Sequence, residues 1–317
     1  MAEDRTTTRE EVIRSLRISK DDFVVEVGGG HEPFWRSDLI FDKYPDEQLH
    51  RSQPLAHAAP VMIADAVRLP LPDAGCDLIF ASHIIEHLPD PGRFLAEVER
   101  CASHVYLEFP AANRELMFAW SFHRWLVEVD GTDLTFYRND VPQLFGSFFH
   151  RNYDFVLDAW AEQRHLELNS HVHCRSSELA WRIAEEGAFE HILAHSVRGE
   201  DRVNGAPRSS VRYTWRQLAS FAALKTLPEP WLDGLVSLWR RRRRGRPREV
   251  RRDLVARLMC LECHGTALRL VGEAILCGGC GTRYEQRMGL FDFDRETARP
   301  RRDDPSIAVA APSPVDT

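Results

Sequence analysis

A short apolar strand that runs into three consecutive glycines is the feature that most limits how this chain can fold. Residues 23–27 read FVVEV, and Gly28, Gly29 and Gly30 follow at once. An apolar, β-branched run of this length predicts a buried strand, and glycines after it predict a tight turn where the backbone can approach a ligand closely. We therefore expect a strand whose carboxyl end opens a binding loop.

Other short apolar runs stop at polar or helix-breaking residues in the same way: 39–41 before Asp42, 61–64 before Asp65, 77–82 at Ser82, and 104–109 before Pro110. Helical apolar spacing occurs at 8–18 and at 92–102. Strands that alternate with helices or loops predict an α/β fold with a doubly wound, mostly parallel sheet. A carboxylate at the end of a strand, as at Asp42, suits a ribose diol because it accepts both hydroxyl hydrogens.

The remaining chain divides by composition. Its segments are the main domain at 1–199, an aromatic- and histidine-rich insertion at about 111–175, a helix at 177–187, a strand at 189–197, a linker at 200–252, a small cysteine-rich domain at 253–295, and a disordered tail at 296–317.

Four sequence segments resemble the class I, Rossmann-like S-adenosylmethionine-dependent methyltransferases: VVEVGGG at 24–30, FDKYP at 41–45, ADAVRLPLPDAGCDLIFASHIIEHLPDP at 64–91, and VYLEFP at 105–110. The resemblance implies S-adenosylmethionine as cofactor. It assigns the methionine part to Glu26, Gly28, Gly29 and Gly30, the ribose to Asp42, the adenine to Asp65 and Ala66, and the space beneath the sulfonium to Ser82 and His83.

The segment after the glycines departs from that family. Only seven residues separate Gly30 from Asp38, too few for a regular crossover helix, so we expect a loop or a stub. A nicotinamide dehydrogenase is the obvious rival interpretation. It is disfavoured because Pro33 stands where a third glycine is needed and Asp42 comes too early for its ribose acid.

Candidate catalytic residues are histidines, because an imidazole can remove a hydroxyl proton at neutral pH. If residues 165–173 are extended, alternate side chains share one face: His165, Glu167, Asn169, His171 and His173. His171 and His173 are the leading candidates for the base, and His83 is the third. Two alternatives stay open, a solvated strand face and a divalent-metal site formed by the three histidines of that row with Glu167.

Two C-x-x-C pairs, Cys260 with Cys263 and Cys277 with Cys280, predict a structural zinc ion in a tetrahedral thiolate site. His264 is an alternative ligand. The sequence from 258 to 293 resembles the small zinc-ribbon proteins that activate tRNA, rRNA and release-factor methyltransferases, although Leu261 replaces the usual proline. The resemblance implies a structural role for this zinc.

Charge is distributed unevenly along the chain. The formal net charge is −7, yet from residue 231 onward 17 Arg stand against 12 Asp and Glu. Residues 231–252 combine an apolar segment with an arginine run, which suits a solvated linker, peripheral contact with anionic lipid, or RNA phosphates. The chain shows no signal peptide and no apolar run long enough to span a bilayer, so we expect it in the cytoplasm.

These features favour a methyltransferase that O-methylates a small molecule or a sugar, such as a polysaccharide precursor, with a histidine as general base. One alternative is an RNA or translation-factor methyltransferase that uses the zinc ribbon and the arginine run to bind its substrate. A second alternative is a non-catalytic zinc-ribbon binding module.

Overall fold

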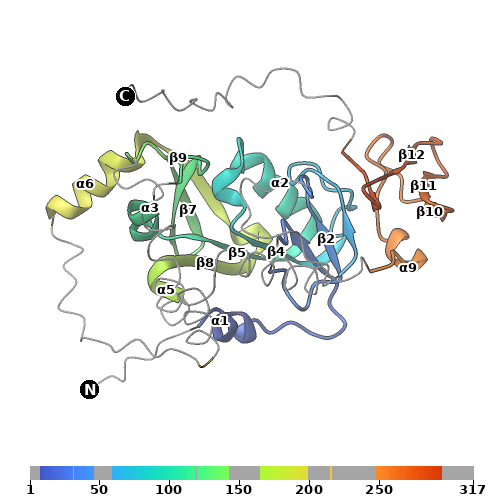
Figure 1. Cartoon of the computed structure of the whole chain (residues 1–317), viewed down its shortest axis with the longest axis horizontal. Helices are drawn as coiled ribbons and strands as arrows, with labels where there is room; N and C mark the ends of the chain where they lie inside the picture. Colours follow the sequence, from blue (N-terminus) through green and yellow to red (C-terminus); the bar gives the residue numbers. More distant parts are fainter. Residues whose placement is uncertain are drawn as a thin grey trace, which may run out of the picture.

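The structure, a computed structural model, describes residues 8–30, 32–45, 59–118, 120–142, 165–198, 215 and 248–294. In these residues the main sheet has the strand order β3-β2-β1-β4-β5-β8 (Figure 1). Its strands are β1 (Val24–Val27), β2 (Leu39–Phe41), β3 (Val61–Met62), β4 (Cys76–Ser82), β5 (Ala102–Pro110) and β8 (Asn169–Arg175). Neighbouring strands are parallel except β8, which is antiparallel to β5. The predicted mostly parallel α/β fold is confirmed.

The two faces of this sheet are covered by different elements. Helix α1 (Arg9–Ser15), which begins with a capping box between Thr8 and Glu11, packs Val12 and Ile13 into a cluster with Phe80 and Tyr106 of the sheet. Helix α2 (Pro91–Cys101) packs its apolar stripe against the other face. Adjacent residues of a strand point to opposite faces, so β1, β4 and β5 contribute side chains to both clusters.

A loop replaces the first crossover helix, as the spacing after Gly30 predicts. Among the described residues between β1 and β2 no helix occurs. Phe34 fills the space instead, because its buried ring stacks on Phe80 with centroids 4.4 Å apart.

A second sheet, in the order β6-β7-β9, lies beyond β8, on the side away from β3. It comprises β6 (Trp125–Asp130), β7 (Asp133–Arg138) and β9 (Ala180–Gly187), and the accompanying short elements are η1 (Ile85–His87), α3 (Ala112–Phe118), α5 (His165–Leu168), η2 (Ser176–Glu178) and α6 (Ala188–Arg198). The core residues Trp125, Val127, Leu134 and Phe136 join this sheet to the main core.

Two predicted elements near β9 were wrong. Residues 177–187 were expected to form a helix, yet β9 is a strand because it pairs in parallel with β7, a partner distant in sequence. Residues 189–197 were expected to form a strand, yet they lie in helix α6, where Ala188 and Ile192 are buried one helical turn apart. Tertiary pairing overrode local sequence preference in the first case, and a helical period was mistaken for a short apolar run in the second.

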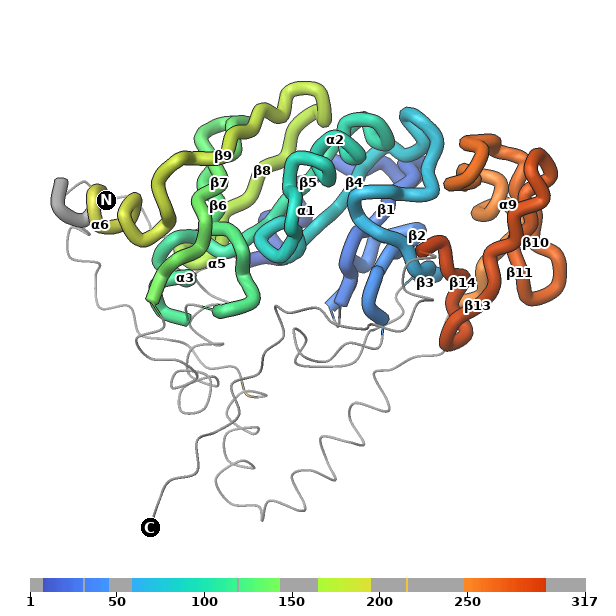
Figure 2. The backbone as a smooth tube through the Cα atoms, turned by 90° about the horizontal axis from the view of Figure 1, so that it is seen from above, coloured from blue at the N-terminus to red at the C-terminus, as the bar shows by residue number. Residues whose placement is uncertain are grey.

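The C-terminal module lies at the β3 edge of the main sheet, at the opposite end from α6 (Figures 1 and 2). It consists of α9 (Arg252–Val255), β10 (Leu268–Val271), β11 (Ala274–Cys277), β12 (Arg283–Tyr284), β13 (Gln286–Arg287) and β14 (Leu290–Phe291). Ile63 exchanges backbone hydrogen bonds with this module: its N–H donates to Phe291 and its carbonyl accepts from Phe293, both at 2.8 Å. The module therefore continues the main sheet past β3.

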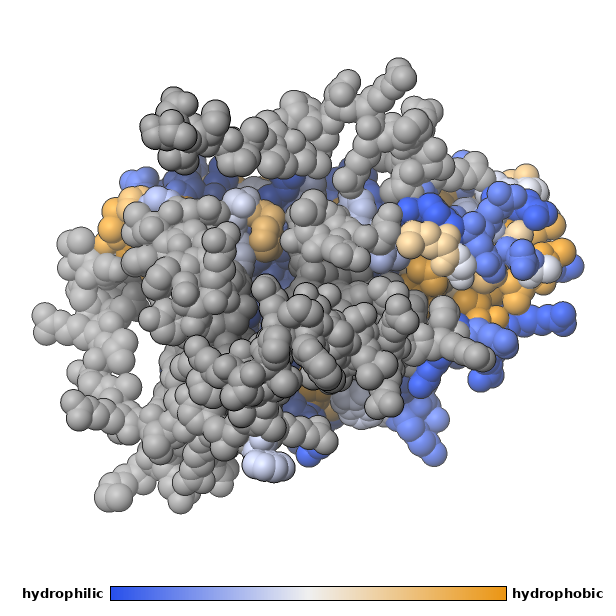
Figure 3. Space-filling view, viewed as in Figure 1, coloured by the Kyte–Doolittle hydropathy of each residue, from blue (hydrophilic) through white to orange (hydrophobic). Residues whose placement is uncertain are grey.

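The surface of the C-terminal module mixes hydrophilic and hydrophobic residues (Figure 3), and Val271 and Met288 are among its exposed apolar side chains. No helix in the part of the chain that the structure describes has both the length and the apolar character needed to cross a bilayer. The basic stretch at 240–247, the rest of the linker except residues 215 and 248–252, and the tail at 296–317 lie outside the described residues.

Candidate functional site

The predicted cofactor residues gather at one edge of the main sheet. In the parallel register Val27 is level with Phe41 and with Ala81, and Phe41 is level with Met62. The carboxyl ends of these four strands therefore meet, which is where ligands bind in open α/β sheets. Gly28 and Asp42 directly follow β1 and β2, Ser82 ends β4, and Asp65 comes shortly after β3, beyond Ile63 and Ala64.

The glycine turn at this edge has the geometry that a close ligand approach requires. Gly28 has φ +71° and Gly30 has φ +54°, both in the left-handed region that favours glycine. A Cβ atom on Gly28 would lie 2.0 Å from Ile84 Cδ1, so any side chain there would clash. The Gly28 N–H donates to the Phe41 carbonyl at 2.7 Å, which fixes the turn over the end of β2.

Glu26 holds the loop that replaces the crossover helix. Its buried carboxylate accepts hydrogen bonds from the Phe34 N–H at 3.0 Å and from the Ser37 hydroxyl at 2.7 Å. Burial raises the pKa of Glu26 to about 7, against the opposing effect of these two hydrogen bonds. Glu26, which the family resemblance assigns to cofactor binding, therefore also has a structural role.

The two strand-end acids differ in their surroundings. Asp42 is buried, and its Oδ1 accepts from the Tyr44 N–H at 2.9 Å. Asp65 is half-buried next to the buried Ala66, and its carboxylate accepts from the Val67 N–H at 3.1 Å and pairs with Lys43 at 2.5 Å. Carboxylates on adjacent parallel strands suit the hydroxyls of a ribose and the edge of an adenine.

Ser82 and His83 lie beside a buried carboxylate, Glu108, that sequence analysis missed. Glu108 sits on β5 level with Ser82, and its Oε1 accepts from the Ser82 hydroxyl at 2.8 Å and from Arg9 Nε at 3.0 Å. Its Oε2 accepts from the Tyr106 hydroxyl and from His165 Nε2, both at 2.8 Å. One carboxylate thus joins α1, β4, β5 and α5.

The charge on Glu108 is well stabilised. Burial opposes ionisation, but the hydrogen bond from His165 and the positive charge of Arg9 outweigh it and hold the pKa of Glu108 well below its usual range. The signal in the sequence was a lone acid inside the apolar strand segment VYLEFP. A buried ionised acid requires partners, but the sequence does not say that Arg9 and His165 are the residues that supply them.

His83 occupies an unusual position directly after β4. Its φ is +55°, a strained conformation for histidine, and its side chain is 35% exposed. Nδ1 lies 3.3 Å from Glu86 Oε1, and Nε2 lies 3.7 Å from Glu108 Oε1. Arg114 Nη1 lies 3.5 Å from Nε2, and because a guanidinium only donates, Nε2 acts there as the acceptor nitrogen.

The other two candidate bases lie on β8. His171 is level with Glu108 and faces the Tyr106 ring at 6.0 Å, whereas His173 is level with Tyr106, farther from the carboxyl edge of the sheet. Burial lowers the pKa of both imidazoles. The helix expected at 177–187, soon after these two residues, is replaced in the structure by β9.

The predicted extended row from His165 to His173 is interrupted. His165 and Glu167 belong to the helical turn α5, and only Asn169, His171 and His173 alternate along β8. Among the described residues, no three of His165, Glu167, His171 and His173 bring their donor atoms within 4.8 Å of one another. In the described chain two other groups bring their donor atoms within 4.8 Å of one another: the four predicted cysteines, and Glu86 with His87 and His123.

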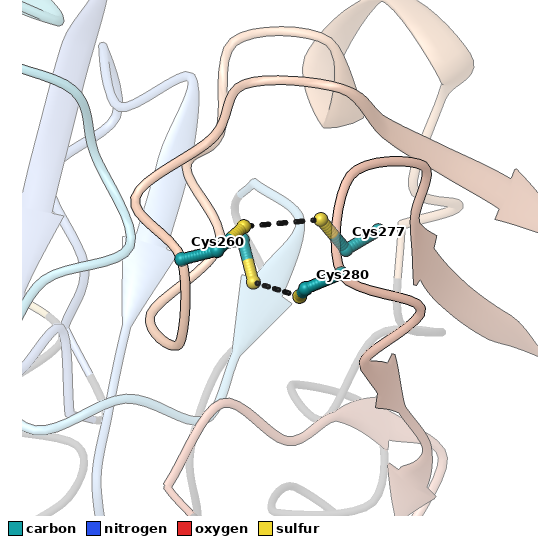
Figure 4. A group of neighbouring side chains, drawn as sticks. Cys260, Cys277 and Cys280 are labelled. Atoms are coloured by element: carbon teal, nitrogen blue, oxygen red, sulfur yellow. Dashed lines mark hydrogen bonds between the residues drawn. The ribbon is translucent and has the colours of Figure 1, made fainter.

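The four predicted cysteines converge in the C-terminal module (Figure 4). Sγ atoms of Cys260 and Cys280 are 3.6 Å apart, as are those of Cys263 and Cys277. Sulfur atoms bound to one tetrahedral zinc at about 2.3 Å are about 3.8 Å apart, so this set fits the ion. His264 is not part of the group. Its backbone has a left-handed φ of +57° in the turn directly after Cys263.

The C-terminal module also reaches the cofactor edge of the sheet. Asp294 follows β14 and is buried, and its Oδ2 lies 3.7 Å from the Lys43 ammonium that pairs with Asp65. Arg68, near Asp65 in sequence, donates to the Leu261 carbonyl at 2.5 Å, one residue after the first cysteine. The adenine side of the candidate site is therefore linked to the cysteine module.

Part of this edge of the sheet matches a known sequence family. Residues 42–104, which include Asp42, Asp65, Ser82 and His83, match the sequence profile of a family described as a methyltransferase domain. The chain therefore contains a methyltransferase domain, and that family implies S-adenosylmethionine as the cofactor. A search of curated proteins finds no significant match.

The solved structures that are similar to this chain match only part of its length. The complex between the Haloferax volcanii Trm112 methyltransferase activator and a methyltransferase matches at 17% identity and TM-score 0.30, over 44% of this chain and 75% of that one. A SAM-dependent methyltransferase from Aquifex aeolicus matches at 18% identity and TM-score 0.26, over 32% and 64% of the two chains. One from Thermotoga maritima matches at 24% identity and TM-score 0.25, over 32% and 49%.

Proposed function

We propose that this methyltransferase O-methylates a small molecule or a saccharide, and that His83 is the general base. The observation that carries the proposal is the position of His83, between two buried carboxylates at the carboxyl end of β4, with its side chain partly exposed. S-adenosylmethionine supplies a methyl group activated by its sulfonium. The residues assigned to the cofactor are Glu26, Gly28, Gly29, Gly30, Asp42, Asp65, Ala66 and Ser82.

The hydrogen bonds of His83 indicate which ring nitrogen would receive the proton of the methyl acceptor. Glu86 accepts from Nδ1–H, which leaves Nε2 as the acceptor nitrogen, where the hydroxyl of the methyl acceptor would take the place of the Arg114 N–H. When the acceptor oxygen bonds to the methyl carbon, the carbon–sulfur bond of the cofactor would break, S-adenosylhomocysteine would leave, and the O–H proton would move to Nε2. Glu86 and Glu108, both ionised and buried, stabilise the imidazolium that forms. His171 is the second candidate, because it is level with Glu108, and His173 is the third.

Aromatic side chains around the η1 segment favour a ring-shaped acceptor. Phe122 stacks on His87 with centroids 5.6 Å apart, Trp120 stacks on Phe118 at 4.7 Å, and Arg114 lies over the Trp120 ring at 5.4 Å. Flat apolar rings combined with polar groups bind the faces of sugars and heteroaromatic molecules.

The proposal is tested with labelled S-adenosylmethionine and a panel of saccharides, phenols and short RNAs. With the best acceptor, His83→Gln should lower kcat/KM at least 100-fold, as loss of a general base does, and leave the affinity for S-adenosylhomocysteine within about twofold. His104→Gln, an exposed histidine of β5, is the matched control and should retain full turnover.

Full turnover of His83→Gln with a marked loss in His171→Gln would transfer the base role to His171. Methylation of RNA in preference to every small acceptor would support the alternative in which the cysteine module and the arginine run bind the substrate. That alternative rests on residues 240–247, which lie outside the described part of the chain.

The cysteine module is proposed to bind one structural zinc ion through Cys260, Cys263, Cys277 and Cys280. The sulfur spacing supports this assignment. Tyr284 adds a second layer, because its hydroxyl contacts Cys260 Sγ at 3.2 Å and accepts from the Leu261 N–H at 2.8 Å.

A further inference from the structure

The second group of potential metal ligands lies on the acceptor side of the sheet. Glu86 and His87 belong to η1, which follows β4, and His123 precedes β6. One donor atom from each of the three lies within 4.8 Å of the other two, and Glu86 Oε1 is 4.0 Å from His87 Nε2. The cluster contains none of the four cysteines and none of the residues assigned to the cofactor.

Two hydrogen bonds hold the two segments together. The Arg124 N–H donates to the Glu86 carbonyl at 2.7 Å, and Trp125 Nε1 donates to the Leu88 carbonyl at 2.8 Å. These bonds flank the cluster in sequence and fix His123 opposite η1. The rings of His87 and His123 meet edge to face with centroids 4.7 Å apart. The cluster is therefore positioned by the backbone, as a built site requires.

Glu86 supplies the observation that points to a ligand. The residue is 1% exposed, and its Oε2 atom is buried with no hydrogen-bond partner among the described atoms. An unsatisfied buried carboxylate oxygen destabilises the folded chain unless a ligand compensates for it. Its other oxygen is engaged by His83, so Oε2 is the atom left for a cation.

His123 is oriented as metal-bound histidines usually are. Its Nδ1 is hydrogen-bonded to Glu115 Oε1, and Glu115, itself 1% exposed, also accepts from Asn139 Nδ2 at 3.3 Å. A carboxylate that holds one ring nitrogen fixes the tautomer and leaves the lone pair on the other. Nε2 of His123 is therefore the available donor atom.

From these contacts we propose that Glu86, His87 and His123 bind one divalent transition-metal ion of the manganese or iron type. Two imidazoles and one carboxylate are a ligand set for such ions, and three protein ligands leave coordination positions open. Ligand atoms about 2.1 Å from one ion are about 3 Å apart, so the cluster contracts slightly on binding. The ion's role rests on the proposed function: it would bind two neighbouring hydroxyls of the acceptor beside His83.

The test is a Mn²⁺ titration of the full-length, zinc-loaded chain, in which electron paramagnetic resonance measures free Mn²⁺ and zinc content is assayed in parallel. The wild type should bind about one Mn²⁺ per chain without loss of zinc. Glu86→Gln and His123→Asn should each weaken binding at least tenfold, a loss typical of metal-site changes. His104→Asn, an exposed histidine outside the cluster, is the matched control and should bind like the wild type.

The absence of saturable Mn²⁺ binding in the wild type, or unchanged binding in Glu86→Gln and His123→Asn, would overturn the site. Because Glu86 is buried, folding of each variant is checked by circular dichroism, and His87→Asn, whose side chain is partly exposed, provides a second ligand variant. S-adenosylhomocysteine binding in the same samples separates the two proposals, since the methyltransferase assignment requires that binding and the metal site does not.

Discussion

At the scale of single residues, the site depends on three buried carboxylates with different partners. Glu26 is bound by a backbone N–H and a hydroxyl, Glu108 by a cation, an imidazole and two hydroxyls, and Glu86 by His83 on one oxygen. Partners decide the protonation of a buried acid. The pKa of Glu26 is raised to about 7 by burial, whereas the pKa of Glu108 is lowered by its charged neighbours.

Glu26 makes the stability of the chain depend on pH in a defined direction. Its pKa is about 7 in the folded chain and about 4.5 in the unfolded chain. Below pH 4.5 both states are protonated and burial of the acid costs nothing; above pH 7 both are ionised and the folded state bears the full cost. The contribution of Glu26 to stability therefore falls as pH rises through this window.

The free energy of unfolding of Glu26→Gln, relative to the wild type, should accordingly rise by on the order of 3 kcal/mol between pH 4 and pH 8. Urea unfolding at a series of pH values measures it. Glu10→Gln, an exposed glutamate of α1, is the matched control. A difference between Glu26→Gln and the wild type that does not change with pH would show that burial does not hold the proton on Glu26.

At the scale of elements, the central strands and the residues at their carboxyl ends are predictable from the sequence. Residues 23–27, 39–41 and 77–82 are apolar runs that local pattern alone identifies, and each ends at the residue assigned to the cofactor. The absence of a helix after Gly30 follows from chain length. These features are local, so single-sequence reasoning reaches them.

Elements fixed by distant partners were not predictable in the same way. β9 is a strand because β7 pairs with it, and Trp181 on β9 packs against Gly92 of α2. The proposed metal site joins η1 to a segment more than thirty residues away, and a backbone hydrogen bond from Arg124 to Glu86 connects the two. Nothing near His123 in the sequence indicates that it faces Glu86.

The cysteine module is the element whose folding should depend most on a ligand. Its described strands have two to four residues each and its one helix has four, so we expect metal binding to supply much of the stability. Cys277→Ser should lose its zinc and lower the melting temperature of the whole chain, because Leu258, Ile275 and Phe291 belong to the main core.

Zinc content by atomic absorption and melting by circular dichroism are the measurements. Cys76→Ser changes a buried cysteine outside the module and should keep its zinc, which separates loss of the metal from loss of a buried thiol. A Cys277→Ser chain with full zinc content and unchanged melting temperature would refute the structural role of the metal.

At the scale of the whole molecule, one sheet connects the cofactor edge, the acceptor side and the cysteine module. β14 and the residues after it continue the sheet past β3, and Asp294 comes within 3.7 Å of Lys43. At the other end, β8 places His171 level with Glu108. Loss of the cysteine module would therefore expose the β3 edge and disturb the adenine side of the site first.

The central claim, that the carboxyl edge of this sheet binds S-adenosylmethionine, is tested most directly by calorimetric titration of the zinc-loaded chain with S-adenosylhomocysteine. We predict saturable binding of about one molecule per chain. Asp42→Ala should weaken that binding at least tenfold, because the carboxylate assigned to the ribose hydroxyls is removed. A folded wild-type chain that does not bind S-adenosylhomocysteine would contradict the claim and favour a non-catalytic module, and unchanged affinity in Asp42→Ala would contradict the ribose assignment.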